Sequence, residues 1–196
     1  MDSVLRKEKI ILGIDPGTRI LGFGVIRVLG GRAEYVEMGV VNLTGEKEHF
    51  PTLKKILHEV LAIIEKYRPD EMAIEAPFYG KNPQVLLKLG RAQGAAISAA
   101  LMRDIPISEY PPRSVKLSVT GKGAASKEQV GTMVQNLLKI DVPQKYPDAT
   151  DALAIAMCHY YHSTSPLQSL KKHSGWGDFI KNNPDRIINV TAKKSQ

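Results

Sequence analysis

Apolar residues in the first part of the chain gather in short runs that predict β-strands. Residues 10–15 form an apolar run that ends in Asp15, which is typical of a strand buried on both faces near the middle of a sheet. Residues 22–29 and 34–43 predict two more strands, and the Gly30-Gly31 pair between them favours an antiparallel hairpin. We therefore expect the chain to open with three consecutive strands.

A helical pattern follows the predicted hairpin. Within residues 52–67, apolar residues recur every three or four positions with charged residues between them, so we expect an amphipathic helix that ends before Pro69. Residues 71–75 then predict a short buried strand that ends in Glu75. Strands and helices in this order indicate an α/β protein.

The segment at residues 83–103 contains no internal proline beyond its first position and predicts a second helix, rich in glycine, alanine and serine. Small side chains let a neighbouring element approach closely. That neighbour is either the sheet beneath the helix or a second copy of the chain, and the sequence leaves both open.

The rest of the chain predicts one more strand and two more helices. Residues 105–109 form a short strand, and Ser126 with Gln129 matches the capping box that starts a helix. A final helix is predicted from about Asp148 to Tyr161.

Length and composition fit one globular domain with an appended tail. The chain has 196 residues, of which 43% are hydrophobic, enough for a sizeable core. We expect residues 1–164 to form that domain and the basic tail at residues 165–196 to be flexible. No run of about 18 apolar residues and no signal-peptide pattern occurs, so we expect a cytoplasmic protein with no membrane partner. The single cysteine, Cys158, is expected to be a small buried residue.

Positive charge is concentrated in the middle of the sequence. The net charge is +7, and residues 81–127 contain eight basic and two acidic residues. A solvated basic surface would explain a scattered excess, but concentration in one segment favours a polyanionic partner.

Acidic residues occur where predicted elements end or begin. Asp15 and Glu75 each end a strand, while Asp148 and Asp151 lie three residues apart on one face at the start of the last helix. Like charges at the ends of adjacent buried strands repel unless protons or a cation lie between them. Oxygen-only ligands suit a hard ion such as Mg²⁺ or Mn²⁺ rather than zinc. Two such ions would support hydrolysis of a phosphodiester.

Each carboxylate also has an ordinary structural explanation. Asp15 precedes Pro16-Gly17 in a sequence that favours a turn, and Glu75 would be a solvated charge at a strand end. Asp148 would serve as a helix N-cap, and Asp151 would interact favourably with the helix dipole. Convergence of all four in space is what would favour the metal site.

Five ordered blocks of the sequence match a known pattern over about residues 10–161. The blocks are Gly13-Ile14-Asp15-Pro16-Gly17-Thr18, Ala73-Ile74-Glu75 followed by Phe78, Lys81 and Asn82, Leu89-Gly90-Arg91-Ala92-Gln93-Gly94, Arg113-Ser114-Val115-Lys116, and Asp148-Ala149-Thr150-Asp151-Ala152-Leu153-Ala154. Together they resemble the bacterial Holliday-junction resolvases of the RuvC family. The Asp-Pro-Gly-Thr turn alone would be a weak signal, whereas the ordered set is specific.

The resemblance implies an RNase H-like fold, with a mixed five-stranded sheet flanked by helices. It implies a homodimer that binds four-way junction DNA and nicks two strands of like polarity symmetrically in DNA recombination and repair. Mg²⁺ would be the cofactor, with Mn²⁺ as a substitute and two ions in each active site. RuvA and RuvB branch-migration proteins would be partners.

The resemblance also assigns roles to individual residues. Asp15, Glu75, Asp148 and Asp151 match the catalytic carboxylates that bind metal in that family. Phe78 resembles an aromatic residue that wedges into base stacking near the junction point. Lys116 and Lys127 match basic positions implicated in DNA contact and catalysis, and the further candidate DNA contacts are Lys81, Arg91, Arg113 and Lys122.

Two other functions stay open from the sequence alone. A phosphotransferase of the actin and sugar-kinase class also places a phosphate loop after its first strand, but it needs two domains and a second phosphate motif, neither of which this short chain offers. A catalytically silent DNA-binding module would use the same carboxylates only in caps and turns.

Overall fold

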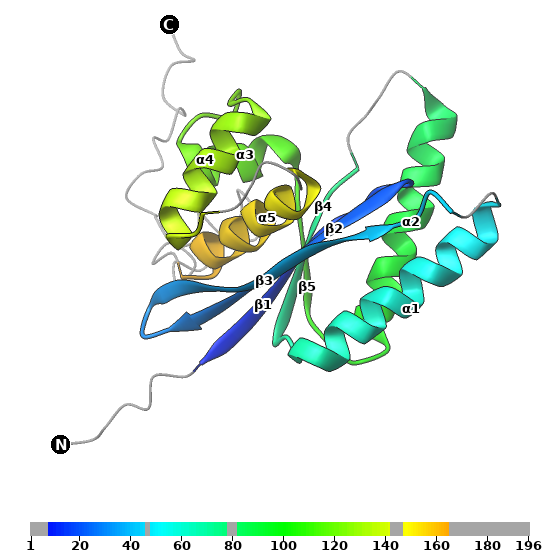
Figure 1. Ribbon diagram of the computed structural model, residues 1–196, viewed down its shortest axis with the longest axis horizontal. Coiled ribbons are helices and arrows are strands. Elements are labelled where there is room, and N and C mark those ends of the chain that lie inside the picture. Colours follow the sequence, from blue (N-terminus) through cyan, green and yellow to red (C-terminus); the bar gives the residue numbers. More distant parts are fainter. Residues whose placement is uncertain (1–7, 46–47, 78–81, 142–146, 165–196) are drawn as a thin grey trace, which may run out of the picture. The chain divides into compact units, whose positions relative to one another are not determined.

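The computed structural model describes residues 8–45, 48–77, 82–141 and 147–164. These residues form a five-stranded sheet and five helices (Figure 1). The strands are β1 (Lys9–Asp15), β2 (Ile20–Leu29), β3 (Arg32–Asn42), β4 (Glu71–Glu75) and β5 (Ile107–Tyr110). The helices are α1 (His49–Tyr67), α2 (Pro83–Leu101), α3 (Pro112–Thr120), α4 (Lys127–Leu138) and α5 (Pro147–Thr164).

Strand pairing makes the sheet mixed, as predicted. The strand order is β3-β2-β1-β4-β5, with β1 antiparallel to β2 and parallel to β4. β2 and β3 form the predicted hairpin, and Gly30 and Gly31 at its turn adopt the positive φ values of 60° and 75° that glycine tolerates best. β4 pairs in parallel with β5, so β1, β4 and β5 all run in the same direction.

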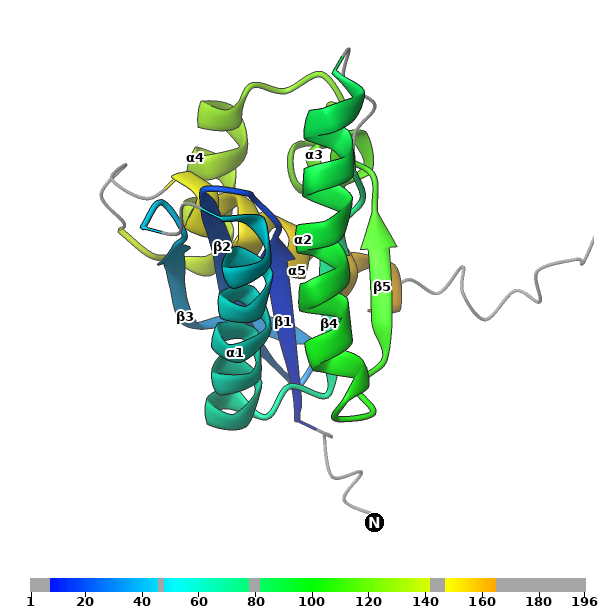
Figure 2. The ribbon, with the colours of Figure 1, turned by 90° about the vertical axis from the view of Figure 1, so that its right-hand side faces the viewer.

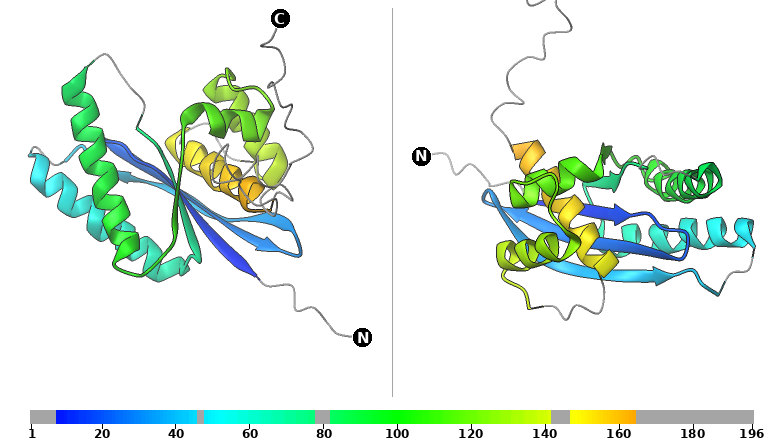
Figure 3. Two further views of the ribbon diagram at one scale, coloured as in Figure 1. Left: turned by 180° about the vertical axis from the view of Figure 1, so that it is seen from behind. Right: turned by 90° about the horizontal axis from the view of Figure 1, so that it is seen from above.

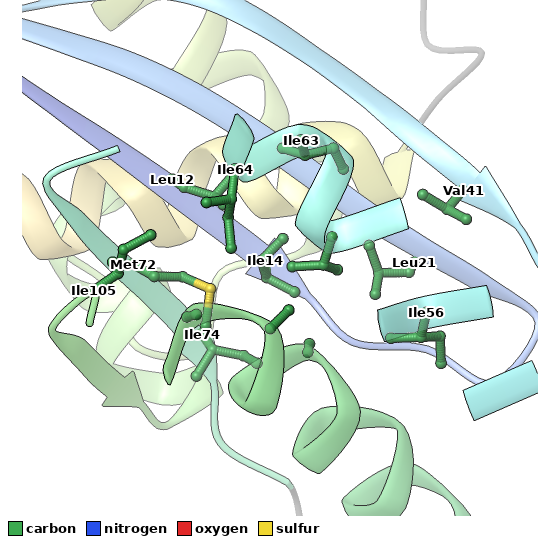
Figure 4. Close-up of a cluster of buried hydrophobic side chains, with 14 of the residues drawn as sticks. Leu12, Ile14, Leu21, Val41, Ile56, Ile63, Ile64, Met72, Ile74 and Ile105 are labelled. Atoms are coloured by element: carbon green, nitrogen blue, oxygen red, sulfur yellow. The ribbon is translucent and has the colours of Figure 1, made fainter. Parts of the chain in front are cut away.

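Helices cover both faces of the sheet. α1 and α2 lie on one face, whereas α3, α4 and α5 lie on the other (Figures 1 and 3). Adjacent residues of a strand point to opposite faces, so Leu12 and Ile14 of β1 join the core beneath α1 and α2 while Ile11 joins the core beneath the other helices. Figure 4 shows part of the first core, where side chains from β1, β4 and α1 gather.

Local sequence signals set two of the helix ends. α1 ends at Tyr67 because Arg68 adopts a left-handed conformation with φ of 47° and Pro69 follows. α4 begins with the predicted capping box, in which the Ser126 hydroxyl accepts a hydrogen bond from the Gln129 backbone and the Gln129 side chain accepts one from the Ser126 backbone. The predictions for these two helices are confirmed.

Helix α3 is absent from the sequence-based expectation, which left this segment without an element. Pro112 occupies its first turn, where a missing N–H has no intrahelical partner to lose, and Gly121 ends it with φ of 73°. Val115 and Val119 are its buried residues. Two apolar positions in so short a helix give too weak a period to be distinguished from a loop.

The small residues of α2 lie mostly against the protein interior. Ala92, Ala96, Ala99 and Ala100 are buried in the core between the sheet and α1. A methyl group added at Gly90 would meet open space. Packing on the sheet therefore explains the alanines, and a second subunit on the remaining surface of α2 stays a prediction.

The single cysteine occupies the buried position expected for it. Cys158 is fully buried, with its Sγ 3.2 Å from Ser118 Oγ. None of the helices described is both long and apolar enough to cross a membrane.

Candidate metal centre

Two of the predicted carboxylates lie at the same edge of the sheet. Asp15 ends β1 and Glu75 ends β4, and the register of these parallel strands places Ile14 opposite Ile74. Neighbouring parallel strands end at the same edge, so sheet topology alone brings the two acidic residues together.

Glycines in β1 and β2 let α5 reach this edge. A methyl group at Gly13 would lie 2.1 Å from the backbone oxygen of Ala152, and one at Gly22 would lie 2.0 Å from the backbone oxygen of Asp148. The backbone of α5 therefore lies directly on the sheet, closer than any side chain would allow. Because Gly22 pairs with Asp15 across the ladder, α5 starts beside that carboxylate.

Three carboxylates converge at this point. One carboxylate oxygen from each of Asp15, Asp148 and Asp151 lies within 4.8 Å of the other two. Glu75 stands outside this trio, but its charge acts on Asp15 and the charge of Asp151 acts on it. The fold therefore brings three of the four predicted carboxylates together and leaves the fourth, Glu75, near enough for their charges to interact.

Burial and like charge make this cluster costly in its ionised form. Burial, followed by the charges of Glu75 and Asp151, raises the pKa of Asp15 to about 8. Burial, followed by the charge of Asp151, raises the pKa of Glu75 to about 7. A divalent cation would offset both costs, and a set of carboxylate oxygens with no histidine or cysteine fits Mg²⁺ or Mn²⁺.

The ordinary structural explanations do not account for this arrangement. α5 begins at Pro147, so Asp148 lies within the first helical turn, and the expectation that it would be the N-cap is wrong. Glu75 is only partly exposed and its pKa is raised, so it is not a freely solvated charge at a strand end. Capping and solvation also give no reason for three acidic side chains to share one small volume.

Two of the predicted basic residues face the cluster. Lys127, the first residue of α4, places its Nζ 2.5 Å from Asp151 Oδ2. Burial raises the pKa of Glu75, and the positive charges of Lys127 and Lys116 oppose that increase. Lys116 reaches this position because α3 is a helix, which the sequence analysis did not predict.

Gln93 is a positioning residue that the sequence analysis did not assign to the site. Its buried side chain donates hydrogen bonds from Nε2 to the Glu75 backbone oxygen at 3.2 Å and to Glu109 Oε1 at 3.1 Å. These bonds tie α2 to the end of β4, where Glu75 lies. A glutamine among the small residues of a helix that packs on a sheet was the available signal.

The other predicted DNA contacts are surface residues or lie outside the described residues. Arg91, Arg113 and Lys122 are exposed residues of α2, α3 and the loop after α3. Phe78 and Lys81 lie outside the described residues, so the wedge and its neighbouring contact stay predictions.

The chain is similar to known proteins in both sequence and structure. Residues 11–159 match the sequence model of a family described as crossover junction endodeoxyribonuclease RuvC. A protein of that name from Bacteroides fragilis is 55% identical over 184 residues, which cover 92% of this chain and 97% of that protein. Another from Christiangramia forsetii is 50% identical over 185 residues, which cover 94% of this chain and 96% of that protein.

Similar solved structures include RuvC from Thermus thermophilus in complex with a Holliday junction substrate. The structural match has a TM-score of 0.73 at 31% sequence identity and covers 79% of this chain and 94% of that one. The mixed five-stranded sheet with helices on both faces is thus the RNase H-like fold of these resolvases, as predicted.

Proposed function

Because the chain belongs to the RuvC family of crossover junction endodeoxyribonucleases and is a Holliday-junction-resolving endonuclease of recombination, we propose that Asp15, Glu75, Asp148 and Asp151 form its catalytic metal site. The observation that supports this most directly is the convergence of carboxylates from β1 and α5 within 4.8 Å. The raised pKa values of Asp15 and Glu75 point the same way, because strongly shifted groups gather at functional sites.

The proposed cofactor is Mg²⁺, with Mn²⁺ as a substitute and two ions in each active site. Bound ions of this kind activate water for attack on a phosphodiester and stabilise the leaving oxygen. The four carboxylates would hold the ions, and the backbone contact between α5 and the glycines of β1 and β2 would keep Asp148 in place relative to Asp15.

Basic residues would supply the remaining chemistry of the site. Lys127 holds Asp151 in position through its ion pair, and Lys116 adds a second positive charge near Glu75. Both charges favour an incoming phosphate, which the carboxylates alone would repel. Lys116, Lys127, Arg91, Arg113 and Lys122 are the described residues that we propose as DNA contacts, with Phe78 and Lys81 as further candidates.

The proposed reaction is symmetric nicking of two strands of like polarity across the junction by a homodimer, in recombination and in DNA repair. One active site per subunit would provide two cuts related by the symmetry of the dimer. RuvA and RuvB are the proposed partners, and the cytoplasm is the proposed location.

A junction-cleavage assay on the wild type and Asp15→Asn tests the metal site. The wild type should nick a synthetic four-way junction in Mg²⁺ and stop in EDTA. Asp15→Asn should bind the junction with near-normal affinity but cleave at least about a hundredfold more slowly, because a lost ligand removes several kcal/mol of charge stabilisation. Normal cleavage by Asp15→Asn would show that this carboxylate is not a ligand.

Two outcomes would favour the other functions. ATP turnover without DNA would indicate a phosphotransferase. Tight junction binding by the wild type in both EDTA and Mg²⁺, with no nicking in either, would indicate a DNA-binding module without catalysis.

A further inference from the structure

A hollow lies beyond the turn that follows Asp15. It has a volume of about 250 Å³ and is lined by residues from the β1–β2 turn, the start of α1 and the first half of α2. None of the carboxylates of the metal centre lines it. The lining residues are Thr18, Arg19, Glu48, His49, Thr52, Leu53, Lys88 and Ala92.

The topology places this hollow at the same edge of the sheet as the metal centre. β1 and β4 both end at that edge, and α1 and α2 start there before they run back along the sheet (Figure 2). Thr18 is only three residues from Asp15, so the two sites lie on either side of one short turn, within about 11 Å of chain. DNA bound at the metal centre would therefore pass within reach of the hollow.

The chemistry of the lining suits an anion. Arg19 and Lys88 contribute two positive charges from different elements, and Glu48 contributes one negative charge. α1 begins at His49 with no acidic residue in its first turn, and the Glu48 side chain accepts no hydrogen bond from its N–H groups. Pro51 has no N–H and the Thr52 N–H bonds the Glu48 backbone oxygen, so the N–H groups of His49 and Phe50 are the donors at the positive end of the α1 dipole, where a phosphate group would be favoured.

His49 provides an independent sign that a ligand belongs here. Its Nε2 is buried, yet it has no hydrogen-bond partner within the described parts of the chain. A buried polar atom without a partner is costly, and native proteins almost always satisfy such atoms with protein groups, water or a ligand. His49 also lines the hollow, but its Nε2 is closed to solvent in this conformation, so the ring has to turn to offer that nitrogen to a phosphate oxygen there.

We propose that this hollow binds a backbone phosphate of the junction DNA other than the scissile one, through Arg19, Lys88, His49 and the start of α1. The proposal rests on the function proposed above only in that the ligand is junction DNA, and it does not depend on which residues hold the metal. The bound phosphate would fix the path of the DNA strand on the side of the β1–β2 turn where α1 and α2 lie. The next part of that strand would then enter the metal centre.

Junction binding in EDTA tests the proposal without the cleavage chemistry. The slope of log affinity against log salt concentration reports the number of phosphate contacts, and each contact contributes about 0.9. Arg19→Gln and Lys88→Gln should each reduce the slope by about 0.9 and weaken binding roughly threefold to tenfold at moderate salt. The matched control is Lys66→Gln, which removes one exposed positive charge at the far end of α1 and should leave the slope unchanged.

A gain-of-affinity variant guards against simple misfolding. Glu48→Gln removes the negative charge of the hollow, so it should tighten junction binding about threefold. A folding defect cannot produce tighter binding. Weaker or unchanged binding by Glu48→Gln would overturn the proposal.

Neutral methylphosphonate linkages identify the phosphate itself. Junctions with one such linkage at successive positions should reveal a position that weakens binding by the wild type but has no effect on the Arg19→Gln, Lys88→Gln double variant. If every sensitive position stays equally sensitive in the double variant, no phosphate occupies the hollow. Loss of cleavage by Asp15→Asn tests the metal site separately, so the two proposals can fail independently.

Discussion

The Lys127 ammonium group lies 2.5 Å from Asp151 Oδ2, so one of the two carboxylates that α5 contributes to the proposed metal centre is also held from the first residue of α4. The Lys127 side chain is 63% exposed and that of Asp151 only 20% exposed. The lysine therefore places its positive charge between solvent and a partly buried acidic cluster. Water screens the attraction between this charge and the carboxylates less than it would on an open surface.

Lys127→Gln should slow cleavage and shift its pH dependence. Burial dominates the raised pKa values of Asp15 and Glu75, and the charge of Lys127 opposes both increases. Without that charge both groups keep their protons to higher pH, so the acidic limb of the rate profile should move upward at a fixed, subsaturating Mg²⁺ concentration. We expect the rate at pH 7 to fall about tenfold to a hundredfold, measured under single-turnover conditions.

Lys122→Gln is the control for this prediction, because it removes one positive charge from an exposed loop position. The dependence of its cleavage rate on pH should keep the wild-type shape, even if the variant binds the junction more weakly. Equal displacement of the acidic limb in both variants would mean that general surface charge, rather than the contact with Asp151, sets the pH dependence.

The acidic cluster should make the metal-free protein less stable as the pH rises. The folded-state pKa of Asp15 is about 8 against an ordinary value of 3.8, so the stability contribution is full below 3.8 and is lost as the pH rises through about 8. Asp15→Asn should therefore raise the free energy of unfolding at pH 8 in EDTA by on the order of 2 kcal/mol. Urea unfolding at pH 5 and pH 8 measures this difference.

In EDTA at pH 8 we expect Asp15→Asn to be more stable than the wild type. Mg²⁺ should reverse this, so that the wild type becomes the more stable of the two. It should stabilise the wild type more than Asp15→Asn, and more at pH 8 than at pH 5, because protons compete for the same oxygens. Asp141→Asn, an exposed position after α4, should change stability by less than about 0.5 kcal/mol in either buffer. A wild type that is as stable at pH 8 as at pH 5 in EDTA would contradict the raised pKa of Asp15.

The sheet and most helices could be predicted because their signals are local. The apolar run that ends in Asp15 and the capping box at Ser126 each depend on a few adjacent residues, and the structure has both. The carboxylates could be selected for the same reason, since an acidic residue at the end of a buried strand stands out. Their convergence could only be hypothesised, because it depends on the packing of α5 against β1 and β2 and on the parallel pairing of β1 with β4.

Features that depend on close contact between distant segments could not be predicted. Nothing near Gly22 in the sequence indicates that the backbone of Asp148 lies against it, because the two are joined only by packing of α5 on the sheet. The ion pair between Lys127 and Asp151 likewise depends on how α4 lies beside α5. Helix α3 was missed because its buried face is too short to show a period.

Gly22→Ala should disturb the proposed metal centre by displacing the backbone of α5. The added methyl group would lie 2.0 Å from the backbone oxygen of Asp148. Because that oxygen belongs to the backbone, no side-chain rotation can relieve the contact. α5 must shift away from β2, which moves Asp148 from Asp15. We expect a loss of about 3 kcal/mol in the free energy of unfolding and a higher Mg²⁺ concentration for half-maximal cleavage.

Gly90→Ala is the matched control on α2, where an added methyl group meets open space. Alanine favours a helix over glycine, so this variant should be more stable by about 0.5–1 kcal/mol with an unchanged Mg²⁺ requirement. If Gly22→Ala lowers stability but leaves the Mg²⁺ requirement of the remaining folded protein unchanged, α5 does not set the metal geometry.

The other half of α5 is anchored to the sheet by a hydrogen-bonded chain of side chains. Glu71 accepts hydrogen bonds from Lys9 Nζ at 2.7 Å and from His159 Nε2 at 2.6 Å. The other ring nitrogen of His159, Nδ1, shares a hydrogen bond of 2.8 Å with the Tyr110 hydroxyl. Three strands thus connect to α5 through His159, which is buried.

Glu71→Gln should weaken this anchor in a pH-dependent way. Partial burial raises the pKa of Glu71, but the hydrogen bonds from Lys9 and His159 outweigh it and hold the pKa below its ordinary 4.5. A lowered pKa contributes stability above pH 4.5, and this contribution disappears as the pH falls through the folded-state value. The variant should therefore lose about 2 kcal/mol at pH 7 and approach the wild type as the pH falls below 4.5.

The control is Glu65→Gln, which breaks an ion pair with Arg103 in which the glutamate side chain is 60% exposed. Screening by water makes such pairs weak, so the change should stay below about 1 kcal/mol at every pH. Urea titrations of the three proteins between pH 3.5 and 7 make the comparison. If the loss of unfolding free energy in Glu71→Gln is the same at pH 3.5 as at pH 7, the glutamate stabilises the protein through its shape. Its charge, held by Lys9 and His159, would then contribute nothing.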